Sequence, residues 1–220
     1  PAWRTMFVVL DVNAEGAPGV SAADGSAPLA NAKVRHAMSL AINRDAITDR
    51  LFGGNAAPAN QYSPSYRAGA PEMPALEYDA DKAKALLAEA GYPDGFTLQF
   101  NAPSDRYPNG TRVAQALAQY WSRIGITVEL NTQPWSVFAK ARKAREMGAF
   151  FYGWGHPQGP AQMISFAFAT RDKDLGLGSS NYSNYSSEAF DAAIKAWAVE
   201  TDAAKADEHV GNAMRAAMAD

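Results

Sequence analysis

The stretch Tyr78-Asp-Ala-Asp-Lys-Ala-Lys-Ala-Leu-Leu-Ala-Glu-Ala-Gly-Tyr-Pro-Asp-Gly-Phe96 decides how the middle of this chain folds. Asp79 is a natural N-cap, because its carboxylate can accept hydrogen bonds from the free amides of a first helical turn. Apolar residues follow at helical spacing, at positions 83, 86, 87 and 90. Gly91 supplies the left-handed position that ends a helix, and Pro93 blocks its continuation. The stretch therefore predicts a helix, a tight turn and then a strand.

Strands and helices alternate after this stretch. Apolar residues alternate with polar ones over 96–100, and a helix with an apolar face follows over 113–124. The next strand spans 126–130, a helix runs from Pro134 to about Met147, and 149–154 is a short apolar run typical of a buried strand. Short connections in this order imply right-handed crossovers. We therefore predict an α/β fold with a mixed, largely parallel sheet flanked by helices.

The N-terminal part adds a strand, two helices and two long loops. Residues 4–10 read as a strand, and 14–30, rich in Ala, Gly, Pro and Ser, as an exposed loop. A buried stripe over 34–42 marks a helix, and Asn43 caps a second one that ends at Gly53-Gly54. Residues 55–77 form a second long loop, of a length that is often functional in compact domains.

Composition excludes several classes of function. The net charge is −3 and the pI is about 5.6, so no basic surface indicates nucleic acid. The absence of cysteine excludes disulfides, thiolate metal sites and cysteine nucleophiles. No window approaches the roughly 18 uninterrupted apolar residues of a membrane span.

Five stretches in a fixed order resemble one family. They are Ala32-Lys-Val-Arg-His-Ala-Met-Ser-Leu-Ala-Ile-Asn-Arg-Asp-Ala-Ile47, Ile124-Gly-Ile-Thr-Val-Glu-Leu130, Pro134-Trp135 with Phe138, Gly153-Trp154-Gly155, and Asn181-Tyr-Ser-Asn-Tyr-Ser-Ser-Glu-Ala-Phe-Asp191. Together with the Tyr78–Phe96 stretch they are similar to the family 5 extracellular solute-binding proteins of bacterial ABC importers, which include dipeptide, oligopeptide, nickel and glutathione binders. The resemblance implies a lobe of the type II periplasmic-binding-protein fold.

The resemblance also implies an organisation and partners. Family members are roughly twice this length or more and have two lobes, so we expect residues 1–220 to be a single lobe excised from a larger protein, closed by helices over about 187–200 and 203–219. The partners would be a peptide or related small solute, the missing lobe and an ABC permease. The expected location is the periplasm, or the cell exterior with a membrane anchor in a Gram-positive organism.

The loop after Trp154 is the expected ligand site. Ligands of open α/β sheets collect beyond the carboxyl ends of the strands, and the last predicted strand leads into Gly155-His-Pro-Gln-Gly-Pro160. The residues alone favour a plain turn. The resemblance favours a ligand wall, with Trp154 stacking on the solute and Gly155, His156 and Gln158 beside it.

One departure from the family concerns the ligand's charge. The peptide binders carry an aspartate a few residues after the Gly-Trp pair, which holds the α-ammonium of the ligand. This chain has no acid there until Asp172. The ammonium-binding role therefore does not transfer. Peptides remain the default ligand, with glutathione-like, opine-like and metal-chelate solutes as alternatives.

Tyrosines and histidines supply further candidates. Tyr182 and Tyr185 lie in a polar aromatic loop, where they either contact the ligand or cover the last helix pair. His156 could touch a metal chelate as in nickel-type relatives, but His36 and His209 lie on other predicted helices. Because metal sites combine several ligands, a hydrogen-bonding or exposed His156 is favoured. We predict no resident metal and no cofactor.

Enzyme and chaperone-like functions are the competing classes. The three histidines fall on separate elements without a nucleophile partner, and the glycine-rich run Gly176–Ser180 lacks the lysine of a phosphate loop. We therefore predict that the protein is not an enzyme. A chaperone-like domain would be distinguished by peptide binding that tolerates any side chain.

Overall fold

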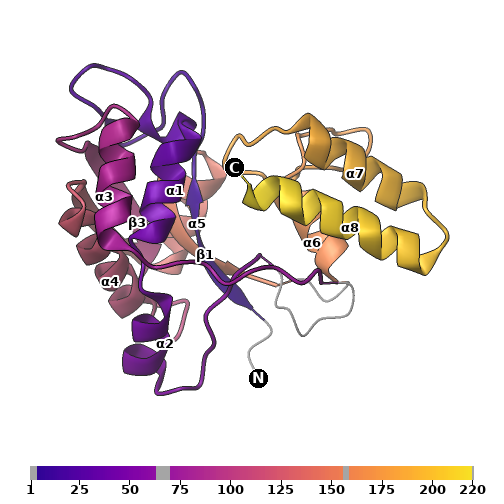
Figure 1. Ribbon diagram of the computed structural model, residues 1–220, viewed down its shortest axis with the longest axis horizontal. Helices are drawn as coiled ribbons and strands as arrows, with labels where there is room; N and C mark the ends of the chain where they lie inside the picture. The colour runs from indigo at the N-terminus through magenta and orange to yellow at the C-terminus, as the bar shows by residue number, and fades with distance from the viewer. Residues whose placement is uncertain (1–3, 63–69, 156–158, 220) are drawn as a thin grey trace. The chain divides into compact units, whose positions relative to one another are not determined.

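The computed structural model describes residues 4–62, 70–155 and 159–219. Contacts divide the chain into two compact units. The sheet unit comprises Phe7–Pro58 and Leu76–Tyr152, and the helical unit comprises Pro1–Met6, Ala59–Ala75 and Gly153–Asp220. The division falls within strands β1 (Thr5–Leu10) and β5 (Ala149–Trp154), which therefore contribute residues to both units (Figure 1).

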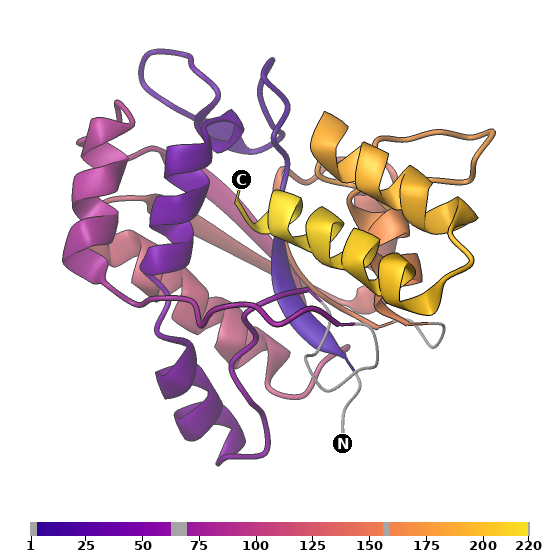
Figure 2. The same cartoon turned by 45° about the vertical axis from the view of Figure 1, so that its right-hand side comes forward.

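The sheet is built around β3 (Thr97–Pro103) (Figure 2). Strand β4 (Thr127–Gln133) pairs with β3 in parallel along its whole length. The other edge of β3 is shared by the antiparallel β2 (Val20–Ser21) near its start and by the parallel β5 further along, and β1 borders β5. This confirms the predicted α/β fold with a mixed, largely parallel sheet.

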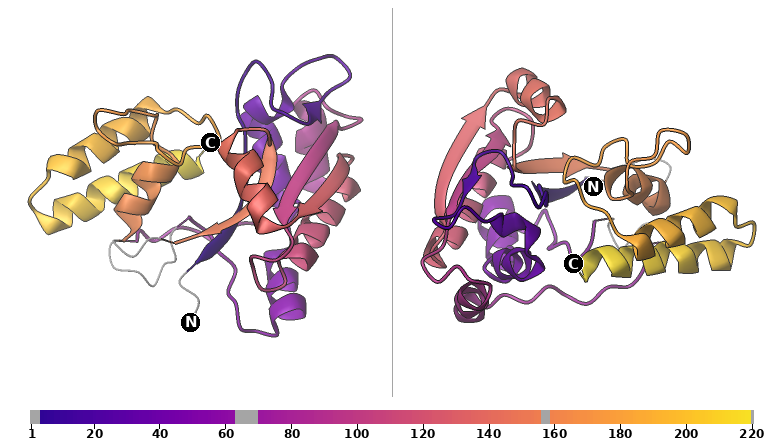
Figure 3. Two further views of the ribbon diagram at one scale, coloured as in Figure 1. Left: turned by 180° about the vertical axis from the view of Figure 1, so that it is seen from behind. Right: turned by 90° about the horizontal axis from the view of Figure 1, so that it is seen from above.

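Helices cover both faces of this sheet. The connection from β3 to β4 and the connection from β4 to β5 run in opposite directions, so right-handed crossovers place their helices on opposite faces. Helix α4 (Gly110–Arg123) packs Trp121 edge-on against Phe100, with ring centroids 4.9 Å apart. Helix α5 (Trp135–Lys143) packs Phe138 against Phe150 at 5.9 Å, and Figure 3 shows α5 in front of the strands when they are seen from behind.

Three further helices and a short 3-10 turn complete the sheet unit. They are η1 (Pro28–Ala30), α1 (Ala32–Leu40), α2 (Arg44–Phe52) and α3 (Ala80–Glu89). The caps predicted for α2 and α3 are confirmed, since Asn43 accepts from the Ala46 amide and Asp79 from the Lys82 amide, each at 2.8 Å. The buried Trp121 donates its indole N–H to the carbonyl of Met38 in α1 at 3.0 Å, which ties α4 to α1.

Two glycine turns meet at the start of the β3–β4 pair. Gly95 has a φ of +72°, and a Cβ atom at this position would lie 1.9 Å from the carbonyl oxygen of Gly125. Gly125 has a φ of +105°. Only glycine combines this backbone conformation with so close an approach of two chains.

The helical unit contains α6 (Pro160–Ala167), α7 (Glu188–Val199) and α8 (Ala203–Met218), together with residues 59–62 and 70–75 of the predicted loop over 55–77, whose residues 63–69 lie outside the described part of the chain. Helices α7 and α8 lie side by side (Figures 1 and 2), and α6 contacts both. Four rings pack edge to face in what we call the closed aromatic cluster, with centroids 4.7–6.3 Å apart: Tyr62, Phe168, Tyr185 and Phe190.

Some elements differ from the sequence predictions. Helix α5 ends at Lys143 rather than near Met147, because Arg145 adopts a left-handed φ of +60°. The segment 14–30 also contains β2 and η1, and α6, which begins at Pro160, was not predicted. In the described part of the chain, no helix is both long and apolar enough to span a bilayer. The single lobe over 1–220 stays a prediction.

Candidate functional site

The carboxyl ends of three parallel strands carry a group of aromatic and cationic residues in the sheet unit. Arg106 and Tyr107 follow β3, Trp135 follows β4, and Tyr152 lies near the end of β5. Since β3 is parallel to both β4 and β5, these residues belong to the same edge of the sheet. This is where ligands bind in open α/β sheets.

The indole of Trp135 is the centre of this group. The guanidinium carbon of Arg106 lies 4.7 Å from the centroid of the Trp135 ring. The ring of Tyr152 stacks on it with an interplanar angle of 18° and a centroid distance of 6.2 Å. The guanidinium carbon of Arg142 lies 4.5 Å from the Tyr152 ring and 5.9 Å from the Trp135 ring. We call Arg106, Trp135, Arg142 and Tyr152 the cationic aromatic cluster.

The cluster has a buried base and an accessible top. Tyr107 is buried and meets the buried Phe151 edge-on at 5.7 Å. Trp135 and Tyr152 are half-buried, whereas Arg106 is exposed. The structure therefore presents one guanidinium to solvent on a fixed aromatic support.

The carboxylate of Asp105 adjoins the cluster, and it is engaged in a hydrogen bond. Asp105 Oδ1 accepts a hydrogen bond from the backbone amide of Trp135 at 2.7 Å. A guanidinium can bind a carboxylate through two parallel hydrogen bonds, and an indole can stack on a planar group. The described residues contain no group of three or more His, Asp or Glu side chains placed to hold a metal. The arrangement is suited to an anionic group attached to a flat or apolar body.

Of the residues predicted around the loop after β5, the structure describes Trp154 and Gly155, both of which belong to the helical unit. Trp154 is the last residue of β5 and is half-buried, and Gly155 is buried. His156 and Gln158 lie outside the described residues. Their predicted contact with a ligand stays a prediction.

The two predicted tyrosines have different surroundings. Tyr182 is half-buried. Tyr185 is buried in the closed aromatic cluster, 6.3 Å from both Phe168 and Phe190. Its carbonyl accepts from the side chain of the buried Asn181 at 2.8 Å. For Tyr185 these contacts favour the interpretation in which the ring covers the last helices.

Arg106, Arg142 and Tyr152 were not among the predicted ligand residues, and Trp135 entered only as part of a family resemblance. A signal was present, because Arg106 and Trp135 each follow a predicted strand of a parallel sheet. Residues in that position share an edge of the sheet. The missing information was that β3 lies between β4 and β5, which brings the three loops together.

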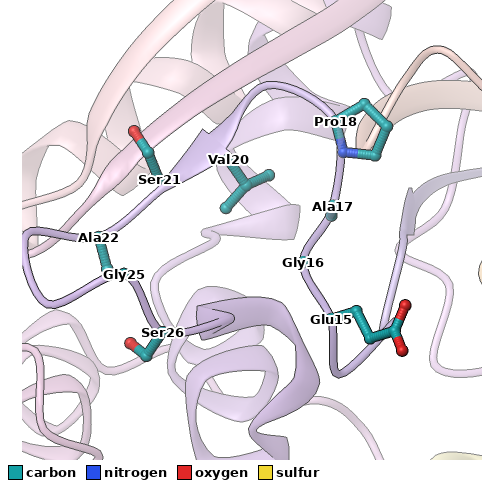
Figure 4. Close-up of a pocket in the computed structure, with 9 residues that line it drawn as sticks. All are labelled: Glu15, Gly16, Ala17, Pro18, Val20, Ser21, Ala22, Gly25 and Ser26. Carbon is teal, nitrogen blue, oxygen red and sulfur yellow. The ribbon is translucent and has the colours of Figure 1, made fainter.

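A separate hollow lies in the loop after β1. Its volume is about 420 Å³, and residues between Glu15 and Ser26 line it (Figure 4). Glu15 is its single ionisable lining residue. Neither the described ligand candidates (Trp154, Gly155, Tyr182 and Tyr185) nor the members of the cationic aromatic cluster line it, so it does not add to the candidate site.

Comparisons with known proteins all indicate the same protein family. The family model described as "Bacterial extracellular solute-binding proteins, family 5 Middle" matches residues 1–174. Heme-binding protein A of Haemophilus influenzae is 33% identical over 173 residues, covering 76% of this chain and 31% of the relative. The dipeptide-binding protein of Escherichia coli is 31% identical over 173 residues, covering 76% of this chain and 32% of the relative.

A solved structure supports the same fold. HbpA2 from Haemophilus parasuis superposes with a TM-score of 0.79 at 27% identity, covering 99% of this chain and 42% of that protein. The chain thus spans about a third of the length of the curated relatives and less than half of the solved one.

Proposed function

Because the chain belongs to family 5 of the bacterial extracellular solute-binding proteins, we propose that it is part of the substrate-binding component of an ABC importer. The complete protein would capture a peptide or related small solute between two lobes and deliver it to a membrane permease. It would act in the periplasm, or at the outside of the cell as an anchored protein.

The observation that carries this proposal is the exposed Arg106 guanidinium 4.7 Å above the Trp135 indole. The pair lies at the carboxyl ends of parallel strands, and the neighbouring Asp105 carboxylate is engaged with a backbone amide. A solute with a free carboxylate could bind Arg106 through charge-assisted hydrogen bonds and rest its body on the indole. Peptides and their derivatives have this chemistry.

Capture would proceed by closure. A ligand held by both lobes stabilises the closed state by its higher affinity for that state. The residues predicted from the family resemblance, Trp154, Gly155, His156, Gln158, Tyr182 and Tyr185, would contribute further contacts. A chain that holds only part of the site is expected to bind the solute weakly.

A non-enzymatic role is part of the proposal. The named relatives are binding proteins for heme and for dipeptides. The cationic aromatic cluster contains no nucleophile paired with a base, which is the arrangement that covalent catalysis requires. We infer that the cluster binds its ligand without transforming it.

Native mass spectrometry of the gently purified full-length protein tests this proposal. We expect a co-purified solute with at least one carboxylate, which denaturation releases intact. A nickel-containing adduct would instead support the metal-chelate alternative. Release of many unrelated long peptides would support the chaperone-like one.

A matched pair of variants connects the solute to the cluster. Arg106→Ala is expected to reduce the amount of co-purified solute at least tenfold. Arg123→Ala removes an arginine that lies 5.6 Å over another ring, that of Tyr120, and is expected to leave it unchanged. Equal retention of the solute by both variants would place its binding site elsewhere.

A further inference from the structure

The first turn of helix α5 is not capped by the side chain of its own N-cap residue. Pro134 occupies the N-cap position, and no side chain of that residue bonds the first turn. The backbone amide of Trp135, the first residue of α5, instead donates to Asp105 Oδ1 at 2.7 Å. Asp105 lies thirty residues earlier, in the loop after β3. A carboxylate at this place satisfies a free amide and interacts favourably with the positive end of the helix dipole.

The loop that carries Asp105 is fixed on its other side as well. The amide of Ser104 donates to the carbonyl of Gln133 at 2.8 Å, which extends the β3–β4 ladder by one residue. Ser104 is thus bound to the end of β4 and Asp105 to the start of α5. The next residue is Arg106, whose guanidinium stacks on Trp135.

Two consecutive residues, Asp105 and Arg106, therefore both contact Trp135. Asp105 bonds its backbone, and Arg106 lies over its ring. A displacement of the α5 N-terminus relative to the loop would change both contacts together. The Asp105 carboxylate, next to Arg106 in the sequence, is also engaged with the positive end of the α5 dipole, which partly offsets its charge beside the site.

We propose that Asp105 is a positioning residue, whose hydrogen bond to the Trp135 amide sets the Arg106 guanidinium over the Trp135 indole in the geometry that receives the ligand's carboxylate. This inference rests on the proposed function for the ligand, but the positioning itself is a property of the ligand-free chain. Asp105 does not contact the ligand and acts through its two neighbours.

Substitutions of Asp105 in the full chain test the positioning. Asp105→Ala removes the acceptor, whereas Asp105→Asn keeps an acceptor oxygen without the charge. NMR would follow the indole N–H of Trp135 and the Nε–H of Arg106, assigned from Trp135→Phe and Arg106→Lys, together with amide exchange in α5. We expect Asp105→Ala to shift both side-chain resonances and to accelerate exchange in the first turn of α5 about fivefold. In Asp105→Asn the two resonances and the exchange rates in α5 should stay close to those of the unsubstituted chain.

Asp79→Ala is the matched control, because it removes an N-cap aspartate from α3. It should accelerate exchange in α3 and leave the Trp135 and Arg106 resonances at their original positions. Asp105→Glu provides a variant that keeps the fold but moves the carboxylate by one methylene, and it should also shift both resonances. Unshifted resonances in Asp105→Ala or Asp105→Glu, or equal shifts in Asp79→Ala, would overturn the proposal.

A titration separates this inference from the proposed function. The dipeptide Ala-Ala, a simple carboxylate probe, is added to the unsubstituted chain at millimolar concentration. Movement of the Arg106 Nε–H resonance supports carboxylate binding at the cluster, and no movement contradicts that part of the proposed function. The resonances of the ligand-free variants decide the role of Asp105 independently.

Discussion

The two aromatic clusters of this chain differ in what surrounds their rings. The closed aromatic cluster of the helical unit joins Tyr62 to rings from the segment after α6 and from helix α7, and both Tyr185 and Phe190 are buried. The cationic aromatic cluster of the sheet unit has two rings in place of four and adds two arginines over them. The comparison teaches that aromatic residues alone do not identify a binding site. The feature that distinguishes the proposed site from the closed cluster is the accessible Arg106 guanidinium at the edge of the sheet.

The largest expected effect concerns the closed cluster. Phe190 is fully buried, so Phe190→Ala leaves a cavity and should lower the free energy of unfolding by about 3–5 kcal/mol. Urea denaturation followed by far-UV circular dichroism measures this loss. The Trp135 indole resonance in the folded fraction should stay unchanged. A displaced resonance would show that the two clusters are not independent.

A smaller effect is expected at the cationic cluster. Arg106→Lys keeps the charge but loses the planar group that stacks on Trp135 and binds a carboxylate in two places. Affinity for the solute released from the full-length protein should fall about tenfold, or about 1.4 kcal/mol. Isothermal titration calorimetry measures this change, and Arg123→Lys is the control. An unchanged affinity would mean that a positive charge alone is enough to bind the solute. The stacked guanidinium would then not be what distinguishes this cluster from the closed one.

Tyr185→Phe distinguishes the two interpretations of Tyr185. If the ring serves packing, the variant should change the free energy of unfolding by no more than about 1 kcal/mol. Its affinity for the solute should be unchanged within a factor of two. A loss of affinity comparable to that of Arg106→Lys would assign Tyr185 to the ligand after all. Calorimetry and urea titration of the same preparation measure both quantities.

The smallest expected effect is on how the stability of the fold depends on pH. It involves Glu200, in the connection between α7 and α8. Glu200 accepts from the amides of Asp202 and Thr201 at 2.8 Å, and His209 Nε2 lies 3.9 Å from its other oxygen. The amide of Asp202 lowers the pKa of Glu200 most, with further lowering by the Thr201 amide and the charge of His209.

The sign of the pH effect follows from this direction. A carboxyl group whose pKa is lowered by folding adds stability at neutral pH, and that stability is lost as the pH falls below the ordinary value of 4.5. Glu200→Gln should therefore show a slightly smaller decrease in urea midpoint between pH 6 and pH 3 than the unsubstituted chain. Identical decreases would show that Glu200 does not contribute to the loss of stability at low pH.

The sequence predicted the fold better than the site, for physical reasons. Helix caps and glycine stops are local, so Asp79, Asn43 and Gly91 could be assigned from their neighbours alone. The end of α5 was misplaced because the left-handed conformation of Arg145 has no signal in a residue that rarely adopts it.

The site depends on contacts between distant residues. Arg106 and Trp135 are 29 positions apart, and their contact requires the order of strands in the sheet, which alternation of apolar residues does not give. The cap on α5 could not be predicted for the same reason, because Asp105 and Trp135 are thirty positions apart in the sequence. The family resemblance drew attention to the loop after Trp154, at the end of β5, and not to Arg106 and Trp135, which follow β3 and β4.

The contact between Gly95 and Gly125 has a consequence at the opposite end of the sheet. The two turns fix where β3 and β4 begin, and the parallel register then runs without interruption from Thr97 opposite Thr127 to Pro103 opposite Gln133. A slip of one residue would move one strand by about 3.3 Å along the other and reverse the direction of its side chains. The spacing between the Arg106 cation and the Trp135 ring at one edge of the sheet is thus set by two glycines at the other end of the strands, about 20 Å away for six steps of about 3.3 Å each.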